Sequence, residues 1–93
     1  MNTQATLFPI TSAYHELKDY FYHDRYLSIR VIHTEGMILI HFEPASEDVY
    51  DEYVWEQADL WYDDIQEWFA KCYPTLSVRL TQRAQDWMIM SIK

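Results

Sequence analysis

Carboxylate side chains recur along the middle of the chain at the spacing of one helix face. Between Val31 and Ala70 the sequence has eleven Asp and Glu residues and no Lys or Arg. At about 100° per residue, five of these carboxylates share one side of a helix; they are Glu52, Glu56, Asp59, Asp63 and Glu67. Such a row can pair with the arginine and lysine side chains of a basic protein, and it can imitate the phosphates of a nucleic-acid strand.

Bulky side chains flank this acidic row. Trp55 and Tyr62 lie seven positions apart on one margin, and Tyr53 and Leu60 lie on the other. Because aromatic rings stack on guanidinium groups, we expect Trp55 and Tyr62 to anchor a basic partner. The five like-charged i,i+4 pairs between positions 47 and 67 cost the helix about 1–2.5 kcal/mol in total, which mixed charges would avoid. An acidic helix face is also commonly only solvated surface, and the sequence leaves that alternative open.

Catalytic and metal-binding patterns are not found in the sequence. The four histidines form no H-x-x-x-H or H-E-x-x-H pair, and a single glycine excludes a glycine-rich phosphate loop. Cys72, the only cysteine, falls on the apolar stripe of the predicted second helix, which indicates a buried, unreactive thiol. We therefore expect no catalytic residue, no metal and no cofactor, and a protein that is not an enzyme.

The composition limits the possible partners. The chain has 93 residues, a net charge of −8 and a pI near 4.7, which argue against direct binding to nucleic acid or to an anionic membrane surface. No apolar run is long enough to span a bilayer, and the first residues do not resemble a signal peptide, so a cytoplasmic location is expected. With 49% apolar and 17% aromatic residues, we expect one folded domain over residues 1–93, with 1–10 as an extended lead-in.

Two helices are predicted from caps and periodicity. The first is expected after a cap at Thr11 or Ser12 and runs to about His23, and the second is expected after a cap at Ser46 and runs to about Cys72. The stripe of the second helix that should face the core consists of Tyr50, Val54, Ala58, Trp61, Ile65, Trp68, Phe69 and Cys72.

Two hairpins are predicted from alternating apolar residues. In the first, strands around 27–31 and 38–42 are joined by a four-residue loop over 33–36. In the second, strands around 76–80 and 88–92 are joined by a loop centred on Ala84. The element order α-β-β-α-β-β predicts an α+β fold, a four-stranded, mainly antiparallel sheet with both helices packed on one face. The strand order cannot be derived from these patterns.

The sheet face opposite the helices is unusually apolar for a solvated surface. This makes it a candidate second interface, for a homodimer or for docking; its residues are Arg30, Leu39, His41, Arg79, Trp87 and Ile89. Two alternatives remain: residues 7–10 fold over part of this face, or one predicted register is wrong.

Together these patterns predict a non-enzymatic inhibitor that binds a basic, nucleic-acid-binding protein through the acidic helix. In size and charge it is similar to the small acidic nucleic-acid mimics that phages use against restriction or CRISPR nucleases. One alternative is an immunity protein or antitoxin that neutralises a basic toxin. The other is a subunit of a homo-oligomeric assembly, or an adaptor.

Overall fold

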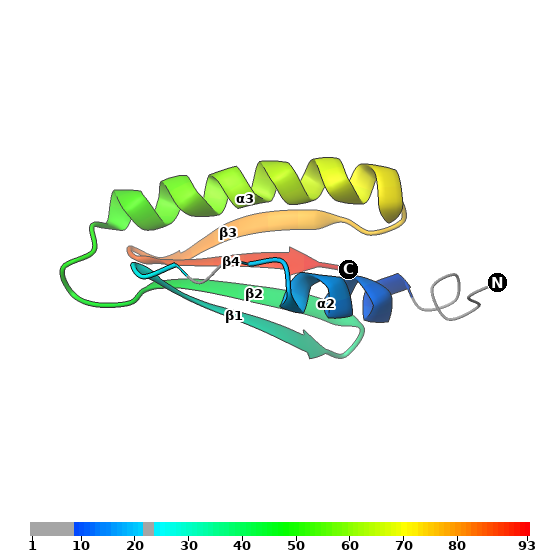
Figure 1. The fold of residues 1–93 in the computed structure, drawn as a ribbon, viewed down its shortest axis with the longest axis horizontal. Coiled ribbons are helices and arrows are strands. Elements are labelled where there is room, and N and C mark those ends of the chain that lie inside the picture. Colours follow the sequence, from blue (N-terminus) through cyan, green and yellow to red (C-terminus); the bar gives the residue numbers. More distant parts are fainter. Residues whose placement is uncertain (1–8, 22–23) are drawn as a thin grey trace.

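The structure is a computed structural model that describes residues 9–21 and 24–93. Residues 1–8 of the expected lead-in, and His23 at the expected end of the first helix, lie outside the described residues. Six elements follow one another: α2 (Pro9–Lys18), β1 (Leu27–Thr34), β2 (Met37–Pro44), α3 (Asp51–Cys72), β3 (Val78–Ala84) and β4 (Trp87–Ile92) (Figure 1). The predicted α+β order is confirmed. The four strands form one antiparallel sheet in the order β1-β2-β4-β3.

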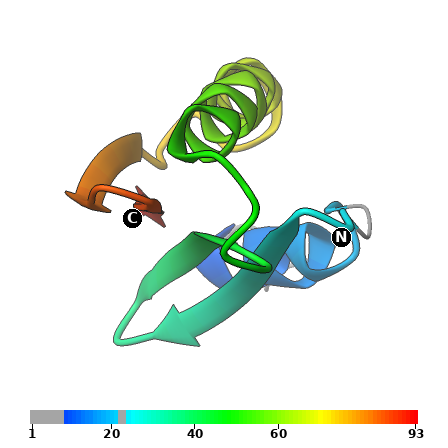
Figure 2. The ribbon, with the colours of Figure 1, turned by 90° about the vertical axis from the view of Figure 1, so that its left-hand side faces the viewer.

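Both helices pack against the same face of this sheet (Figure 2). Phe42 of β2 stacks on Trp61 of α3 with ring centroids 5.7 Å apart. On the same side of the sheet, His33 of β1 contacts Tyr14 of α2 at 5.1 Å. Within the described residues no helix covers the opposite face, which is called the open face below.

The core lies between β2, β4 and the two helices. Its fully buried side chains alternate along β2 and recur every three or four residues along α3, as the periodicity predicts. They are Ala13, Leu17, Ile38, Ile40, Phe42, Val54, Ala58, Ile65, Met90 and Ile92.

The first hairpin turns more tightly than predicted. Ile29 pairs with Phe42, so the loop has two residues, Glu35 and Gly36, and the predicted four-residue loop is wrong. Both loop residues have positive φ, 49° and 76°, as a two-residue turn that follows the sheet twist requires. The register is displaced by two residues, an even number, so each side chain keeps its predicted face.

The second hairpin is displaced in the same way. Leu80 pairs with Met90 rather than with Met88, and the ladder is irregular between Gln82 and Ala84. Here too the displacement of two residues leaves the predicted faces unchanged. The predicted pairing is therefore wrong in register and right in which side chains face the helices.

Helix α2 begins and ends earlier than predicted. It starts at Pro9, a residue suited to a first helical turn because it lacks an N–H, and it ends at Lys18. Tyr20 and Phe21, predicted to be helical, follow the helix and pack on the aromatic side chains of α3. Phe21 contacts Trp61 edge-on and Tyr20 contacts Trp68, each at 5.4 Å, so both rings pack against α3 instead of continuing α2.

Helix α3 begins at Asp51 and not at Ser46. Tyr50 is the N-cap residue, with extended backbone (φ −71°, ψ 145°) and no side-chain cap. A helix that started at Ser46 would place Val49 on the same side as Glu52, facing solvent. In the structure Val49 instead packs against the core, which requires a turn before the helix.

Two residues at the ends of α3 do not face the core as predicted. Tyr50 precedes the first helical turn and is 80% exposed. Cys72 is exposed, whereas Tyr73, the residue after the helix, is buried against Phe69, so the predictions that Tyr50 and Cys72 face the core are wrong. No helix in the described residues is long and apolar enough to cross a membrane.

Candidate functional site

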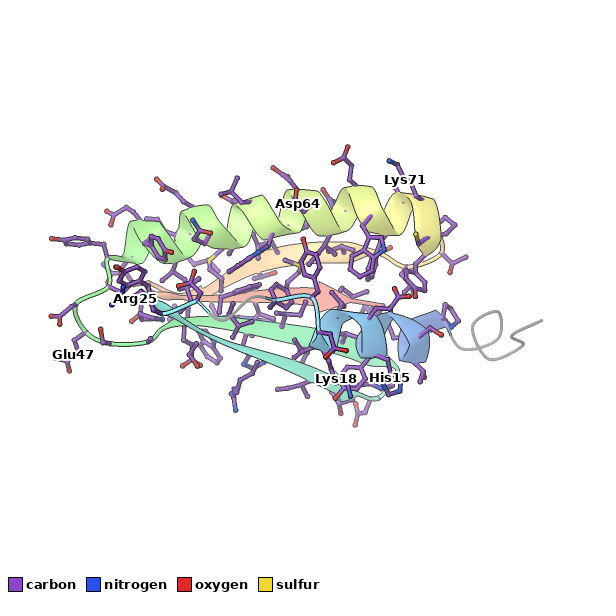
Figure 3. All side chains as sticks on the ribbon, in the orientation of Figure 1. His15, Lys18, Arg25, Glu47, Asp64 and Lys71 are labelled. Atoms are coloured by element: carbon purple, nitrogen blue, oxygen red, sulfur yellow. The ribbon has the colours of Figure 1, made fainter. Side chains whose placement is uncertain are left out.

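The acidic row lies on the solvent side of α3. In Figure 3 the neighbouring Asp64 also points away from the sheet. The five carboxylates predicted to share one face are all exposed; they are Glu52, Glu56, Asp59, Asp63 and Glu67. The opposite side is held by Val54, Ala58, Ile65 and Phe69, none more than 1% exposed. The row is therefore carried on a helix that packing holds in place against the sheet.

The two expected aromatic anchors are engaged within the chain. The indole Nε1 of Trp55 donates a hydrogen bond to the carbonyl oxygen of Gln85 at 2.8 Å. The hydroxyl of Tyr62 donates to the carbonyl oxygen of Val78 at 3.4 Å, and it accepts a bond from Gln66 Nε2 at 2.8 Å. Both rings are half-buried against the core. They border the acidic row, and their polar atoms serve the contact between α3 and the sheet.

The other margin of the acidic row is formed by Leu60 and Tyr53, which differ in exposure. Leu60 is 58% exposed and has the character of an apolar contact point in the middle of the row. Tyr53 is half-buried, and its hydroxyl donates a hydrogen bond of 3.1 Å to Asp24 Oδ2. Burial first, and then the adjacent Asp24 carboxylate, raise the pKa of Tyr53.

Three tyrosines line a small hollow at the N-terminal end of α3. Tyr26, Tyr50 and Tyr53, with Asp48 and Val49, line an open hollow of about 240 Å³; we call it the tyrosine hollow. Tyr26 and Tyr50 are also two of the most exposed large hydrophobic residues of the described chain, at 47% and 80%. Sequence periodicity missed this site, because it assigned Tyr50 to the core.

The open face brings together the residues of the predicted second interface. Arg30, His41 and Ile89 lie opposite one another on β1, β2 and β4. Leu39 and Arg79 share the next row, both paired through Ser91. Ile89 is only 8% exposed and no residue of this set is among the largely exposed hydrophobics, so neighbouring side chains cover much of the apolar surface.

His41 occupies the centre of this face beside Trp87, with ring centroids 5.5 Å apart. Both of its ring nitrogens and the Trp87 Nε1 are out of reach of solvent and have no hydrogen-bond partner. Burial, and then the positive charge of Arg30, lower the pKa of His41, and Glu43 opposes them by raising it. Burial and Arg30 thus both favour the neutral form of the ring.

A larger hollow of about 590 Å³ lies beside the edge strand β1. Its apolar wall is formed by Phe21, Leu27, Ile29 and Val31, and its polar rim by Lys18, Asp19 and Asp24.

Metal-binding and nucleophilic groups are not gathered in the part of the chain that the structure describes. Over residues 9–21 and 24–93 no three His, Cys, Asp or Glu side chains are placed to hold a metal ion. Cys72 is exposed at the C-terminal end of α3, close to Lys71.

No protein-family model, curated protein or solved structure matches this chain.

Proposed function

We propose that this protein is a non-enzymatic inhibitor whose acidic row occupies the nucleic-acid-binding surface of a basic protein. One observation carries the proposal: Glu52, Glu56, Asp59, Asp63 and Glu67 all face solvent from one continuous helix whose other side is buried. Carboxylates on a helix that packing holds in place keep their relative positions. Binding through them then costs little ordering of the backbone.

The dimensions of the row support mimicry of a nucleic-acid strand. From Glu52 to Glu67 the helix rises about 22 Å, or one carboxylate about every 6 Å. Phosphates on one strand of B-DNA are about 3.4 Å apart along the axis, so the row covers the length of six or seven phosphates at a lower charge density. A groove lined by arginine and lysine for phosphates can pair with such a row, and the association should be fast and sensitive to salt.

Negative charge is concentrated in the part of the sequence that includes α3. The segment between Val31 and Ala70 carries a formal charge of −11, and the rest of the chain carries seven basic and four acidic residues, or +3. A basic partner is therefore steered towards the side of the molecule that bears α3.

The test is an affinity capture from host lysate at low salt, followed by competition with a nucleic acid. The captured basic protein is purified and bound to a labelled oligonucleotide that it recognises, and this protein is titrated in. We expect the oligonucleotide to be displaced. Reversing the row with Glu56→Lys and Asp63→Lys should weaken the complex by more than ~2 kcal/mol.

A matched control separates the row from net charge. Asp19→Lys with Asp86→Lys makes the same change in charge at exposed positions outside α3, and it should weaken the complex far less. Equal losses for the two double variants, or binding that leaves the oligonucleotide in place, would contradict the proposal.

A further inference from the structure

The tyrosine hollow joins residues from three parts of the chain at the N-terminal end of α3. Tyr26 directly precedes β1, Asp48 and Val49 belong to the turn after β2, and Tyr50 and Tyr53 begin α3. Figure 3 places Arg25 and Glu47 at this same end of the molecule. The hollow is therefore a product of the tertiary fold, and its walls are mainly aromatic.

A single carboxylate holds two of the three tyrosines in place. Asp24 Oδ1 accepts hydrogen bonds from the backbone N–H of Tyr26 at 2.7 Å and of Leu27 at 3.2 Å. Its other oxygen, Oδ2, accepts from the hydroxyl of Tyr53 at 3.1 Å. The rings of Tyr26 and Tyr53 meet edge to face, 5.5 Å apart at 75°. Two walls of the hollow are thus fixed before any ligand arrives.

The chemistry of the walls selects a flat cation. Tyrosine faces attract cations through the ring quadrupole, and a guanidinium can also stack on them. The structure contains one example beside the hollow, because the Arg25 guanidinium lies over the Tyr26 ring at 5.5 Å. An ammonium group is compact and strongly hydrated, so a lysine gains less from the same walls.

The surrounding charge disfavours an anion at this position. The first turn of a helix attracts anions because its backbone N–H groups are free. Here, however, the acidic residues Glu47, Asp48, Asp51 and Glu52 surround that turn, and Asp48 lines the hollow itself. Their negative charge exceeds the roughly half unit of positive charge at a helix N-terminus.

We propose that the tyrosine hollow receives an arginine side chain of the basic partner. This inference rests on the proposed function. Trp55 and Tyr62 form hydrogen bonds within the chain, and the tyrosine hollow supplies the aromatic anchor for the partner in their place. From Tyr53 to Glu56 the helix rises only about 5 Å, so one basic surface can reach the hollow and the row together. The exposed rings of Tyr26 and Tyr50 then become covered.

The test uses two labelled peptides, hexa-arginine and hexa-lysine, whose affinities are measured by fluorescence anisotropy at low ionic strength. Tyr50→Leu and Tyr26→Leu should each lower the affinity for hexa-arginine about fivefold or more. They should change the affinity for hexa-lysine less than twofold, so the preference for arginine is lost. Tyr50→Phe, which keeps the ring, should retain it. Because Tyr50 is 80% exposed, these variants at position 50 are expected to fold.

Two comparisons make the result decisive. Tyr14→Leu replaces a tyrosine of α2 outside the hollow and should leave both affinities unchanged. The double reversal Glu56→Lys and Asp63→Lys should lower both affinities alike. If the double reversal lowers the peptide affinities and the tyrosine variants do not, the tyrosine hollow is excluded as a binding site and the acidic row is retained. If the tyrosine variants lower the affinity for hexa-arginine and the double reversal does not, the acidic row is excluded as a binding site. Equal binding of the two peptides by the unmodified protein, or no binding of either, overturns the inference.

Discussion

The indole Nε1 of Trp55 in α3 donates a hydrogen bond of 2.8 Å to the carbonyl oxygen of Gln85, thirty residues further along the chain. This bond ties the acidic helix to the turn between β3 and β4. Trp55→Phe should lower the free energy of unfolding by about 0.5–1.5 kcal/mol and leave partner affinity within about threefold, because the N–H is used internally. Denaturant unfolding and a binding titration measure the two effects. Tyr62→Phe removes two hydrogen bonds of the hydroxyl, to the Val78 carbonyl at 3.4 Å and from Gln66 Nε2 at 2.8 Å, and should likewise cost stability. A loss of affinity without a loss of stability for Trp55→Phe would contradict this assignment.

Charge repulsion within the acidic row should lower the stability of the fold, so reversing one of its charges should raise the free energy of unfolding. Asp63 has like-charged neighbours at i−4 and i+4, Asp59 and Glu67. Asp63→Lys turns two repulsive pairs into two attractive ones, and it should raise the free energy of unfolding by about 1 kcal/mol at low salt. The gain should shrink at high salt, where charges are screened. A variant that is more stable and binds its partner less well would show that the row is retained at a cost to stability; reduced stability would argue against it.

The tight turn of the first hairpin carries backbone strain. Glu35 has φ 49°, a conformation that asparagine and glycine adopt more readily than glutamate. Glu35→Asn should raise the free energy of unfolding by about 0.5–1 kcal/mol. Gly36→Ala should lower it, since Gly36 has φ 76°, although no atom lies within 4 Å of an added Cβ. Thermal unfolding of the two variants checks the sign of each effect, and equal melting temperatures would refute the strain.

The open face makes stability sensitive to mild acid through His41. Burial, followed by the charge of Arg30, lowers its pKa below 6.5, so the unfolded state binds the proton more readily. The contribution is fully present above pH 6.5 and is lost as the pH falls through the lowered value. The difference in unfolding free energy between the unmodified protein and His41→Phe should show this loss. By NMR titration, Arg30→Gln should raise the pKa of His41 and Glu43→Gln should lower it further. An unchanged pKa in both variants would mean that neither charge acts on the ring.

Alkaline conditions test the contact between α2 and the end of α3. Burial, followed by a hydrogen bond to the Glu16 carboxylate, raises the pKa of Tyr73 to about 12, above the ordinary 10.0. Its stabilising contribution is therefore complete below pH 10 and is lost as the pH rises from 10 towards 12. Relative to Tyr73→Phe, the unmodified protein should lose unfolding free energy over that range. A constant difference up to pH 12 would contradict the assigned environment.

Side-chain faces could be predicted because they depend only on local periodicity. In strands the period is two, so the register errors of two residues left Ile38, Ile40 and Phe42 on the helix side. In α3 the period of 3.6 placed Glu52 and Glu67 on the solvent side, wherever the helix began.

Positions at the ends of elements could not be predicted in the same way. Tyr50 and Cys72 satisfy the apolar periodicity of α3, yet both are exposed, because Tyr50 lies before the first helical turn and Tyr73, not Cys72, packs against Phe69 at the other end. The start of α3 depends on Val49, because its burial against the core requires a turn before the helix. The capping preference of Ser46 favours an earlier start of the helix.

By itself, the sequence determined the element types, the faces of the side chains and the acidic row, because each follows from periodicity and charge within one segment. Only the tertiary structure decided the strand order β1-β2-β4-β3 and the two-residue turn at Glu35 and Gly36. It also decided the tyrosine hollow, where Asp24 holds Tyr26 against Tyr53, 27 positions further along the chain. Contacts over such separations depend on which surfaces are buried together, and no local pattern in the chain specifies that.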